Sequence, residues 1–145
     1  MEYTTDMEVR YSETDQMGVV YHSNYFSWFD VARCRLLDEV GIPYPWIEEQ
    51  GFLCPVINAE ISYGVPFRFG ETATIYTRIS KTTPVRTTYS YRIFLKGDDP
   101  ETTKPRITGS TTHCLVDADT FKPSSIKRAL PHLYDKYKEI EQEEA

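Results

Sequence analysis

A long helical stretch comes before a series of strand-like segments, and this order is the feature that most limits the fold. The helix is expected over 23–40, where apolar side chains recur at steps of three and four residues. Ser23 or Asn24 offers an oxygen for the N-cap, while Gly41 and Pro43 predict the end of the helix. The recurring positions are Phe26, Phe29, Ala32, Arg33, Leu36, Leu37 and Val40.

Five segments rich in Thr, Tyr, Val and Ile favour β-strands, and the turns between the later ones are short enough for antiparallel pairing. Such a sheet can bury the long helix only by wrapping around it. The sequence therefore predicts an α+β fold, with a five-stranded antiparallel sheet around one central helix. It also predicts one domain over 1–145, with a C-terminal helix and an acidic tail from about residue 124. The expected strands are 6–11, 52–63, 71–80, 86–95 and 105–118.

Composition excludes several function classes. The chain has 145 residues and a net charge of −6, which argues against a basic face for nucleic acid. It has no apolar run long enough for a membrane span and no signal-peptide pattern, so a cytoplasmic protein is expected. Cys34, Cys54 and Cys114 are widely spaced and form no CxxC pair, so we expect buried thiols and no metal site.

Two motifs carry a resemblance to a known family. The stretch "RYSETDQMGVVYHSNYFSWFDVAR" is similar to the Asp-x-x-Gly-x-Val-Tyr-His-x-x-Tyr entry to the helix in hotdog-fold acyl-CoA thioesterases of the 4-hydroxybenzoyl-CoA thioesterase type. The stretch "AEISYGVPFRFGE" resembles the same family's strand, its proline-containing turn and the Gly-Glu or Gly-Asp step that begins the next strand. The likeness is greatest to the short bacterial branch associated with the Tol-Pal system. It implies a hotdog fold and a homodimer at least, with a homotetramer left open.

The resemblance assigns roles to the first motif. The family's catalytic Asp falls on Asp15, and its Tyr-His step falls on Tyr21 and His22, which complete the catalytic set. The peptide amide of His22, at the start of the helix, is the implied oxyanion donor. Gly18 is expected to let the loop approach the thioester, and Tyr25 to line the acyl pocket.

Further residues are expected at the margins of this site. Glu60 is a candidate auxiliary group that faces the cleft from a neighbouring chain, with a plain strand carboxylate as the alternative. The resemblance places the phosphates of coenzyme A near the turn that carries Lys81 and Arg86. His113 lies in the middle of a predicted strand and is expected to be structural.

The predicted reaction is hydrolysis of an acyl-CoA to a carboxylic acid and coenzyme A. The leaving thiol has a pKa of about 8.5, as for Cys, so a carboxylate and an oxyanion donor suffice. Asp15 can act as a nucleophile or as a general base, and the sequence does not choose between them. No cofactor is expected, since coenzyme A is part of the substrate. The alternative is a non-catalytic hotdog module that binds an acyl chain or a partner.

Overall fold

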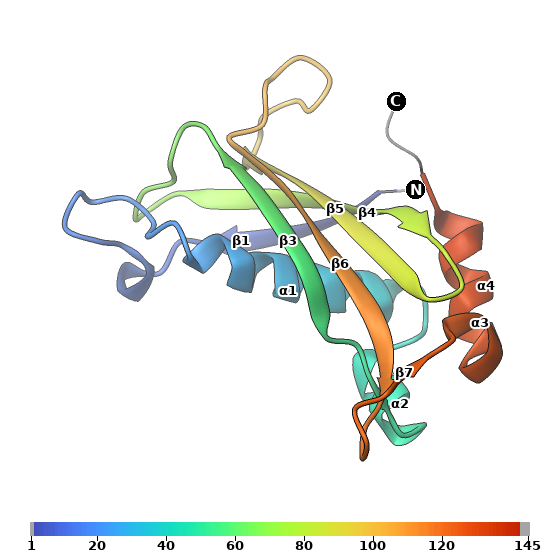
Figure 1. The fold of residues 1–145 in the computed structure, drawn as a ribbon. Helices are drawn as coiled ribbons and strands as arrows, with labels where there is room; N and C mark the ends of the chain where they lie inside the picture. Colours follow the sequence, from blue (N-terminus) through green and yellow to red (C-terminus); the bar gives the residue numbers. More distant parts are fainter. Residues whose placement is uncertain (1, 143–145) are drawn as a thin grey trace.

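The long helix α1 (Asn24–Glu39) lies against the concave side of a curved antiparallel sheet (Figure 1). The computed structural model describes residues 2–142. The α+β architecture predicted from the sequence, one long helix enclosed by a sheet, is confirmed.

In the described part of the chain five long strands build the sheet, in the spatial order β1, β4, β5, β6, β3, and each pair of neighbours is antiparallel. Strand β6 pairs with β5 on one side and with β3 on the other, so Ser110 lies between Ser90 and Glu60. The strands are β1 (Tyr3–Glu8), β3 (Val56–Tyr63), β4 (Thr72–Thr82), β5 (Arg86–Leu95) and β6 (Ile107–Asp117).

Shorter elements close the ends of this layer. The two-residue strands β2 (Phe52–Leu53) and β7 (Pro123–Ser124) pair with the C-terminal end of β6. The 3-10 turn η1 follows β1, the short helix α2 follows α1, and two helices, α3 and α4, end the described chain beside the sheet (Figure 1). Their bounds are η1 (Tyr11–Glu13), α2 (Tyr44–Glu49), α3 (Ile126–Ala129) and α4 (Pro131–Ile140).

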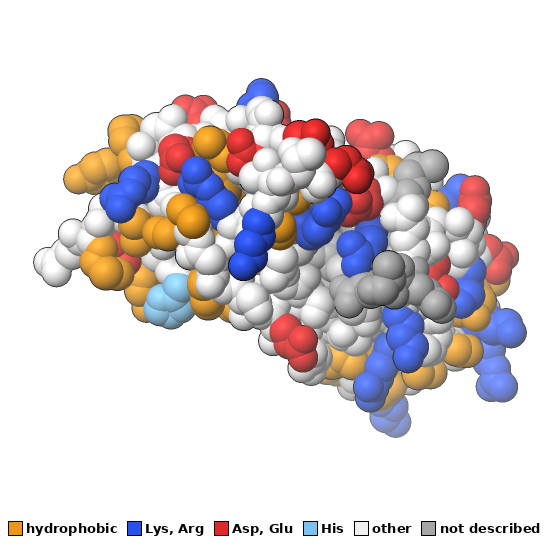
Figure 2. Space-filling view, turned by 90° about the horizontal axis from the view of Figure 1, so that it is seen from above, with side chains coloured by type: hydrophobic (Ala, Val, Ile, Leu, Met, Phe, Trp, Pro, Cys, Tyr) orange, Lys and Arg blue, Asp and Glu red, His pale blue; other side chains and the backbone are white. Residues whose placement is uncertain are grey.

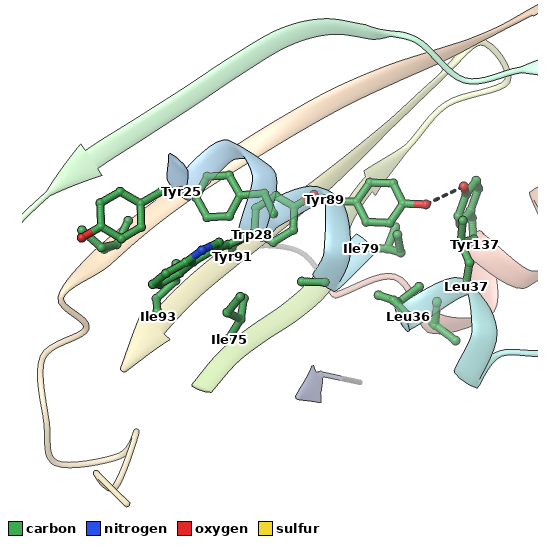
Figure 3. Packing of buried hydrophobic residues seen from close by; sticks show 14 of the residues in the cluster. Tyr25, Trp28, Leu36, Leu37, Ile75, Ile79, Tyr89, Tyr91, Ile93 and Tyr137 are labelled. Carbon is green, nitrogen blue, oxygen red and sulfur yellow. Dashed lines mark hydrogen bonds between the residues drawn. The ribbon is translucent and has the colours of Figure 1, made fainter. Parts of the chain in front are cut away.

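The face of α1 that meets the sheet is strongly aromatic. Trp28, Phe29 and Leu36 are completely buried (Figure 3 shows the cluster around Trp28 and Leu36). Phe29 stacks on Tyr91 of β5 with ring centroids 4.2 Å apart. A Cβ at Gly109 of β6 would lie 2.7 Å from the Phe29 ring, so this position requires glycine. Each such buried side chain contributes about 1.5–3 kcal/mol to the hydrophobic stabilisation of the fold.

Strands β4 and β3 differ in burial. Along β4, inward and outward positions alternate regularly between buried and partly exposed side chains. Along β3, seven of the eight residues are exposed, so both faces of this edge strand are open. Its side chains include the apolar Val56, Ile57 and Tyr63, each 44–49% exposed. Within residues 2–142, β3 pairs with β6 on one side only, so its other edge is open and favours pairing with a further strand.

Several expected boundaries are wrong. The first strand is three residues earlier than predicted, because β1 pairs with Thr72–Thr77 of β4 and Tyr11 already belongs to η1. The predicted strand over 52–63 is divided into β2 and β3, with Pro55 between them, because proline lacks the amide that a sheet ladder needs. The predicted C-terminal helix is likewise two helices, since Pro131 begins α4.

The expectations for α1 are partly wrong. Gly41 has a φ of 79° and follows the helix as predicted. Within the described residues no side chain caps the first turn, and the side-chain amide of Asn24 donates instead to the Glu13 carbonyl. Tyr25 and Trp28, absent from the expected apolar face, are fully buried, whereas Arg33 is only partly buried.

The three cysteines are free, as expected, but none is fully buried. Cys34, Cys54 and Cys114 all retain partial solvent exposure. Burial raises the pKa of the Cys54 thiol to about 11, which keeps it protonated near neutral pH.

Candidate active site

A tight loop over 14–20 carries the predicted catalytic carboxylate. Thr14 and Val20 form an antiparallel bridge that closes the loop. Inside it the Asp15 amide donates to the Val19 carbonyl at 2.9 Å, and the Gly18 amide donates to the Asp15 carbonyl at 3.0 Å. Gly18 adopts a φ of 76°, which residues with a Cβ rarely accept. The local sequence therefore presents Asp15 on a reverse turn directly before α1.

This loop forms one wall of a cavity of about 190 Å³. The start of α1 and the C-terminal end of β3 form the other walls, and the three segments meet at one end of the molecule (Figure 1). The lining combines one carboxylate with aromatic and aliphatic side chains. Its residues are Asp15, Met17, Val19, Val20, His22, Tyr25, Tyr63, Gly64, Pro66 and Ile107.

The Asp15 carboxylate is held by one oxygen only. Its Oδ1 accepts a hydrogen bond from the Met17 amide at 2.9 Å, which is the geometry of an Asx turn. Within residues 2–142 the second oxygen, Oδ2, has no hydrogen-bond donor. Asp15 is therefore oriented by its own loop and retains a free oxygen for a water or a carbonyl carbon.

The start of α1 offers amide donors to the same cavity. Within the described residues the His22 and Ser23 amides donate to no backbone carbonyl, whereas the Asn24 amide donates to Tyr21. Unused amides at a helix N-terminus carry the positive end of the helix dipole. A carbonyl oxygen placed here would be polarised without a cationic side chain.

Tyr63, at the end of β3, is a cavity residue that the motif did not identify. Its hydroxyl donates to the His22 carbonyl at 3.2 Å, and its ring lies edge-on to the His22 ring at 6.1 Å. The ring also lies 6.0 Å from that of Tyr25. Tyr63 thus joins the sheet edge to the helix start. The only signal in the sequence was its place directly before the glycine that ends the strand.

The structure brings together three of the five predicted residues of the first motif. Asp15, His22 and Tyr25 line the cavity. Gly18 and Tyr21 lie beside it and not in its lining: Gly18 shapes the loop, and the half-exposed Tyr21 places its ring 4.4 Å from that of His22.

The other predicted contacts lie elsewhere within the chain. Glu60 lines a separate hollow of about 290 Å³ on the outer face of the sheet, because it is three residues from Tyr63 and points to the opposite side. Lys81 and Arg86 lie near the β4–β5 turn, where Arg86 pairs with Cys114 of β6. The cavity is at the other end of β6, near Ile107.

A different arginine lies close to the cavity. A Cβ at Gly18 would lie 3.7 Å from the Arg68 guanidinium, and Arg68 forms a backbone bridge with Val19. Arg106 is nearby but occupied, since it pairs with Glu71 at 3.2 Å and lies over the Phe67 ring. Arg68 belongs to the quoted "GVPFRFG" turn, yet nothing in the sequence placed this turn against the Asp15 loop.

Exposed apolar side chains surround this end of the molecule. Tyr11, Met17, Val65 and Phe69 are each at least 60% exposed. Figure 2 shows hydrophobic side chains gathered at that end, with Lys and Arg side chains among them. Exposed apolar groups around a cavity are typical of a binding surface.

His113 is structural, as expected. It is 3% exposed and bonds through both ring nitrogens, to the Cys54 carbonyl at 3.1 Å and to the Thr111 hydroxyl at 3.0 Å. In the part of the chain that the structure describes, no three His, Cys, Asp or Glu side chains gather in a way that could hold a metal ion. None of the helices over 2–142 is long and apolar enough to cross a membrane.

Known proteins resemble this chain over nearly its whole length. Residues 9–135 match the thioesterase-like superfamily. A Bacillus subtilis protein named "Putative acyl-CoA thioesterase" is 38% identical over 132 residues, which are 91% of this chain and 92% of the relative.

Two solved structures agree with this match. A DHNA-CoA thioesterase from Staphylococcus aureus superimposes with a TM-score of 0.88 at 34% identity, covering 95% of this chain and 89% of that one. A hypothetical protein from Thermus thermophilus gives a TM-score of 0.84 at 29% identity, over 99% of this chain and the whole of the other.

Proposed function

The chain belongs to the thioesterase-like superfamily of hotdog-fold enzymes, and from this membership we propose that it hydrolyses acyl-CoA thioesters with Asp15 as its catalytic carboxylate. The observation that carries the proposal is the composition of one cavity. A carboxylate with a free oxygen and a helix start with unused amide donors share it.

In the proposed reaction the thioester carbonyl lies between these two groups. The His22 amide stabilises the oxyanion, while Asp15 either removes a proton from an attacking water or attacks the carbonyl carbon itself. The thiolate of coenzyme A then leaves. When water is the attacking group, the acid is released directly. When Asp15 attacks, a mixed anhydride forms on Asp15, and water hydrolyses it to release the acid and restore the carboxylate. These steps need no cofactor, and coenzyme A enters only as part of the substrate.

The size and lining of the cavity support a compact acyl group. A protein cavity of about 150 Å³ holds a benzene molecule, and this one has about 190 Å³. Tyr25 and Tyr63 place aromatic rings in its wall. An aromatic acyl group agrees with the name of the Staphylococcus aureus DHNA-CoA thioesterase. Membership of the 4-hydroxybenzoyl-CoA type, and of its Tol-Pal-associated branch, stays a prediction from the opening motif.

The open edge of β3 supports the homodimer that the family resemblance implies. Pairing β3 with a second copy would satisfy its edge and cover Val56, Ile57 and Tyr63. An antiparallel two-fold pair would place the Val56 end of one β3 beside the Tyr63 end of the other. The partner subunit's Lys81 and Arg86, near the Val56 end of its sheet, would then approach the cavity that they do not reach within their own chain, whereas the partner's Glu60 would stay on the outer face of the joined sheet.

The direct test is release of free thiol from a panel of acyl-CoAs. We expect faster turnover of short and aromatic acyl-CoAs than of long-chain ones. No thiol release from any member would favour the alternative, a non-catalytic module that binds an acyl group. Light scattering at micromolar concentration tests the dimer separately, and an active monomer of about 17 kDa would contradict it.

A further inference from the structure

A second carboxylate, two residues before Asp15, is buried and fully engaged. Glu13 is only 5% exposed. Its Oε2 accepts from the Trp28 indole at 2.7 Å, and its Oε1 accepts from the Arg10 amide at 2.8 Å. Burial alone would raise the Glu13 pKa, but these two donors, together with the Arg10 guanidinium at 3.4 Å from Oε2, outweigh it and lower the pKa, so the side chain is held as a carboxylate.

The backbone of Glu13 makes two more contacts. Its carbonyl accepts from the Tyr21 amide at 2.8 Å and from the Asn24 side chain at 2.8 Å. These two donors lie just after the loop over 14–20, at the start of α1. Glu13 therefore fastens the beginning of the loop to the segment that follows its end.

The Trp28 indole connects Glu13 to residues that form or support the cavity walls. Its ring packs edge-on against Tyr25 at 5.1 Å and against Phe67 at 5.7 Å (Figure 3 shows Trp28 and Tyr25). The Tyr25 hydroxyl accepts from the Phe67 amide, and the Phe67 carbonyl accepts from the Val20 amide. The Glu13 carboxylate is thus bonded to the cluster that also holds the other end of the loop.

We propose that Glu13 is a positioning residue for thioester hydrolysis: its bond to the Trp28 indole sets where Asp15 stands relative to the amides at the start of α1. Glu13 does not touch the substrate, because it is buried and absent from the cavity lining. The inference rests on the proposed function. Its basis is that a small displacement of a catalytic group from a productive geometry lowers turnover strongly.

Glu13→Gln is the sharpest variant, since it keeps the size of the side chain. A carboxylate accepts from both Trp28 and Arg10, whereas an amide has one acceptor oxygen and presents donors on its nitrogen. One of the two bonds is therefore lost. We expect kcat to fall at least about tenfold while KM for an acyl-CoA stays within about threefold. Glu2→Gln is the control, because Glu2 is a partly buried carboxylate that pairs with Arg92 on the outer face of the sheet, and neither residue lines the cavity.

A role in stability alone predicts a different result. In that case Glu13→Gln would lower the melting temperature but leave kcat per folded molecule unchanged, and this outcome would overturn the proposal. Trp28→Phe keeps the aromatic packing and removes the indole donor. We expect the double variant with Glu13→Gln to lose no more kcat than the more damaging single variant. Multiplied losses would show that the two residues do not act through their shared bond.

Hydrogen exchange provides a readout that needs no activity. Glu13→Gln should speed exchange of the loop amides at Asp15 and Gly18, which are bonded within the loop, and leave the amides of β5 protected. Unchanged exchange over 14–20 would overturn the positioning role by itself. A parent protein that hydrolyses no thioester would instead contradict the proposed function, and the exchange experiment would still decide whether Glu13 holds the loop.

Discussion

Polar groups near the two ends of α1 differ in burial and in hydrogen bonding. At its start, the exposed His22 borders a cavity, and the neighbouring amides and the Asp15 carboxylate keep unused hydrogen-bonding capacity. Toward its other end, in what we call the buried end, His113 is buried and both of its ring nitrogens are hydrogen-bonded. There the Tyr89 and Tyr137 hydroxyls also bond to each other, at 2.7 Å (Figure 3).

This difference in hydrogen bonding distinguishes the candidate active site from the hydrophobic core. Burying a polar group without a partner costs about 1–3 kcal/mol, so the buried end pairs its polar groups. The exposed end leaves unused amide donors and a free carboxylate oxygen beside a cavity, where a substrate could bond to them. The comparison predicts that changes at the start of α1 alter turnover and that changes at the buried end alter stability.

The largest effect is expected for Asp15→Asn. The amide keeps the oxygen that accepts from Met17, so the loop is retained, but it can neither remove a proton nor attack a carbonyl. We expect kcat to fall at least about 100-fold with an unchanged melting temperature. The measurement is steady-state thiol release, with Asp38→Asn at the exposed far end of α1 as the control. Turnover within a few-fold of the parent would remove Asp15 from the mechanism.

The next effect concerns the buried end and its response to pH. Burial lowers the His113 pKa from 6.5 to about 4, with Arg33 adding to the shift. Below pH 6.5 the unfolded chain binds a proton that the folded chain does not. Stability therefore falls as the pH drops from 6.5 toward 4, by about 2 kcal/mol at pH 5.

Urea unfolding at pH 7 and pH 5 measures this loss. The Cys54 carbonyl can only accept, so Nδ1 donates to it and Nε2 accepts from Thr111, an arrangement that a second ring proton would break. His113→Gln has no titrating group and should flatten the pH dependence. The same change at the exposed His132 should leave it intact. An equally steep loss in His113→Gln would assign it to other groups.

The sequence predicted the architecture because periodicity reports burial directly. Residues on the inward faces of β4 and α1 repeat with the periods of a strand and a helix. Boundaries were less accurate where a single side chain decides them. Pro55 divides one expected strand, and Asn24 bonds to Glu13 in place of capping its own helix.

The candidate site could be predicted only where its residues are close in the chain. Asp15, His22 and Tyr25 lie within eleven residues and share a motif. Tyr63, at the end of β3, and Arg68, in the turn after it, come close to the same residues only in the folded chain. The contact between Tyr63 and His22 spans 41 residues, so it leaves no local sequence pattern. Glu13 was within the quoted motif, but its role depends on the Trp28 indole, which only the packing of α1 brings near.

A smaller loss of turnover is expected for His22→Ala. The proposed oxyanion donor is the backbone amide, which alanine keeps, while the ring supplies packing against Tyr21 and Tyr63. We expect kcat to fall less than about tenfold, well below the loss at Asp15. Parallel kinetics of the two variants give the comparison. Equal losses would mean that the imidazole takes part in the chemistry.

The smallest effect is expected for Tyr63→Phe, which removes one hydroxyl and keeps the ring. The lost bond to the His22 carbonyl is a single neutral hydrogen bond at a half-exposed position, worth about 0.5–1.5 kcal/mol. Because that carbonyl belongs to the helix start, its release should loosen the amides that face the thioester. We expect kcat to fall roughly two- to tenfold, with the acyl-CoA KM little changed, since the ring still lines the cavity. A raised KM with unchanged kcat would instead make the Tyr63 hydroxyl a substrate contact, and the start of α1 would then hold its geometry without help from the sheet edge.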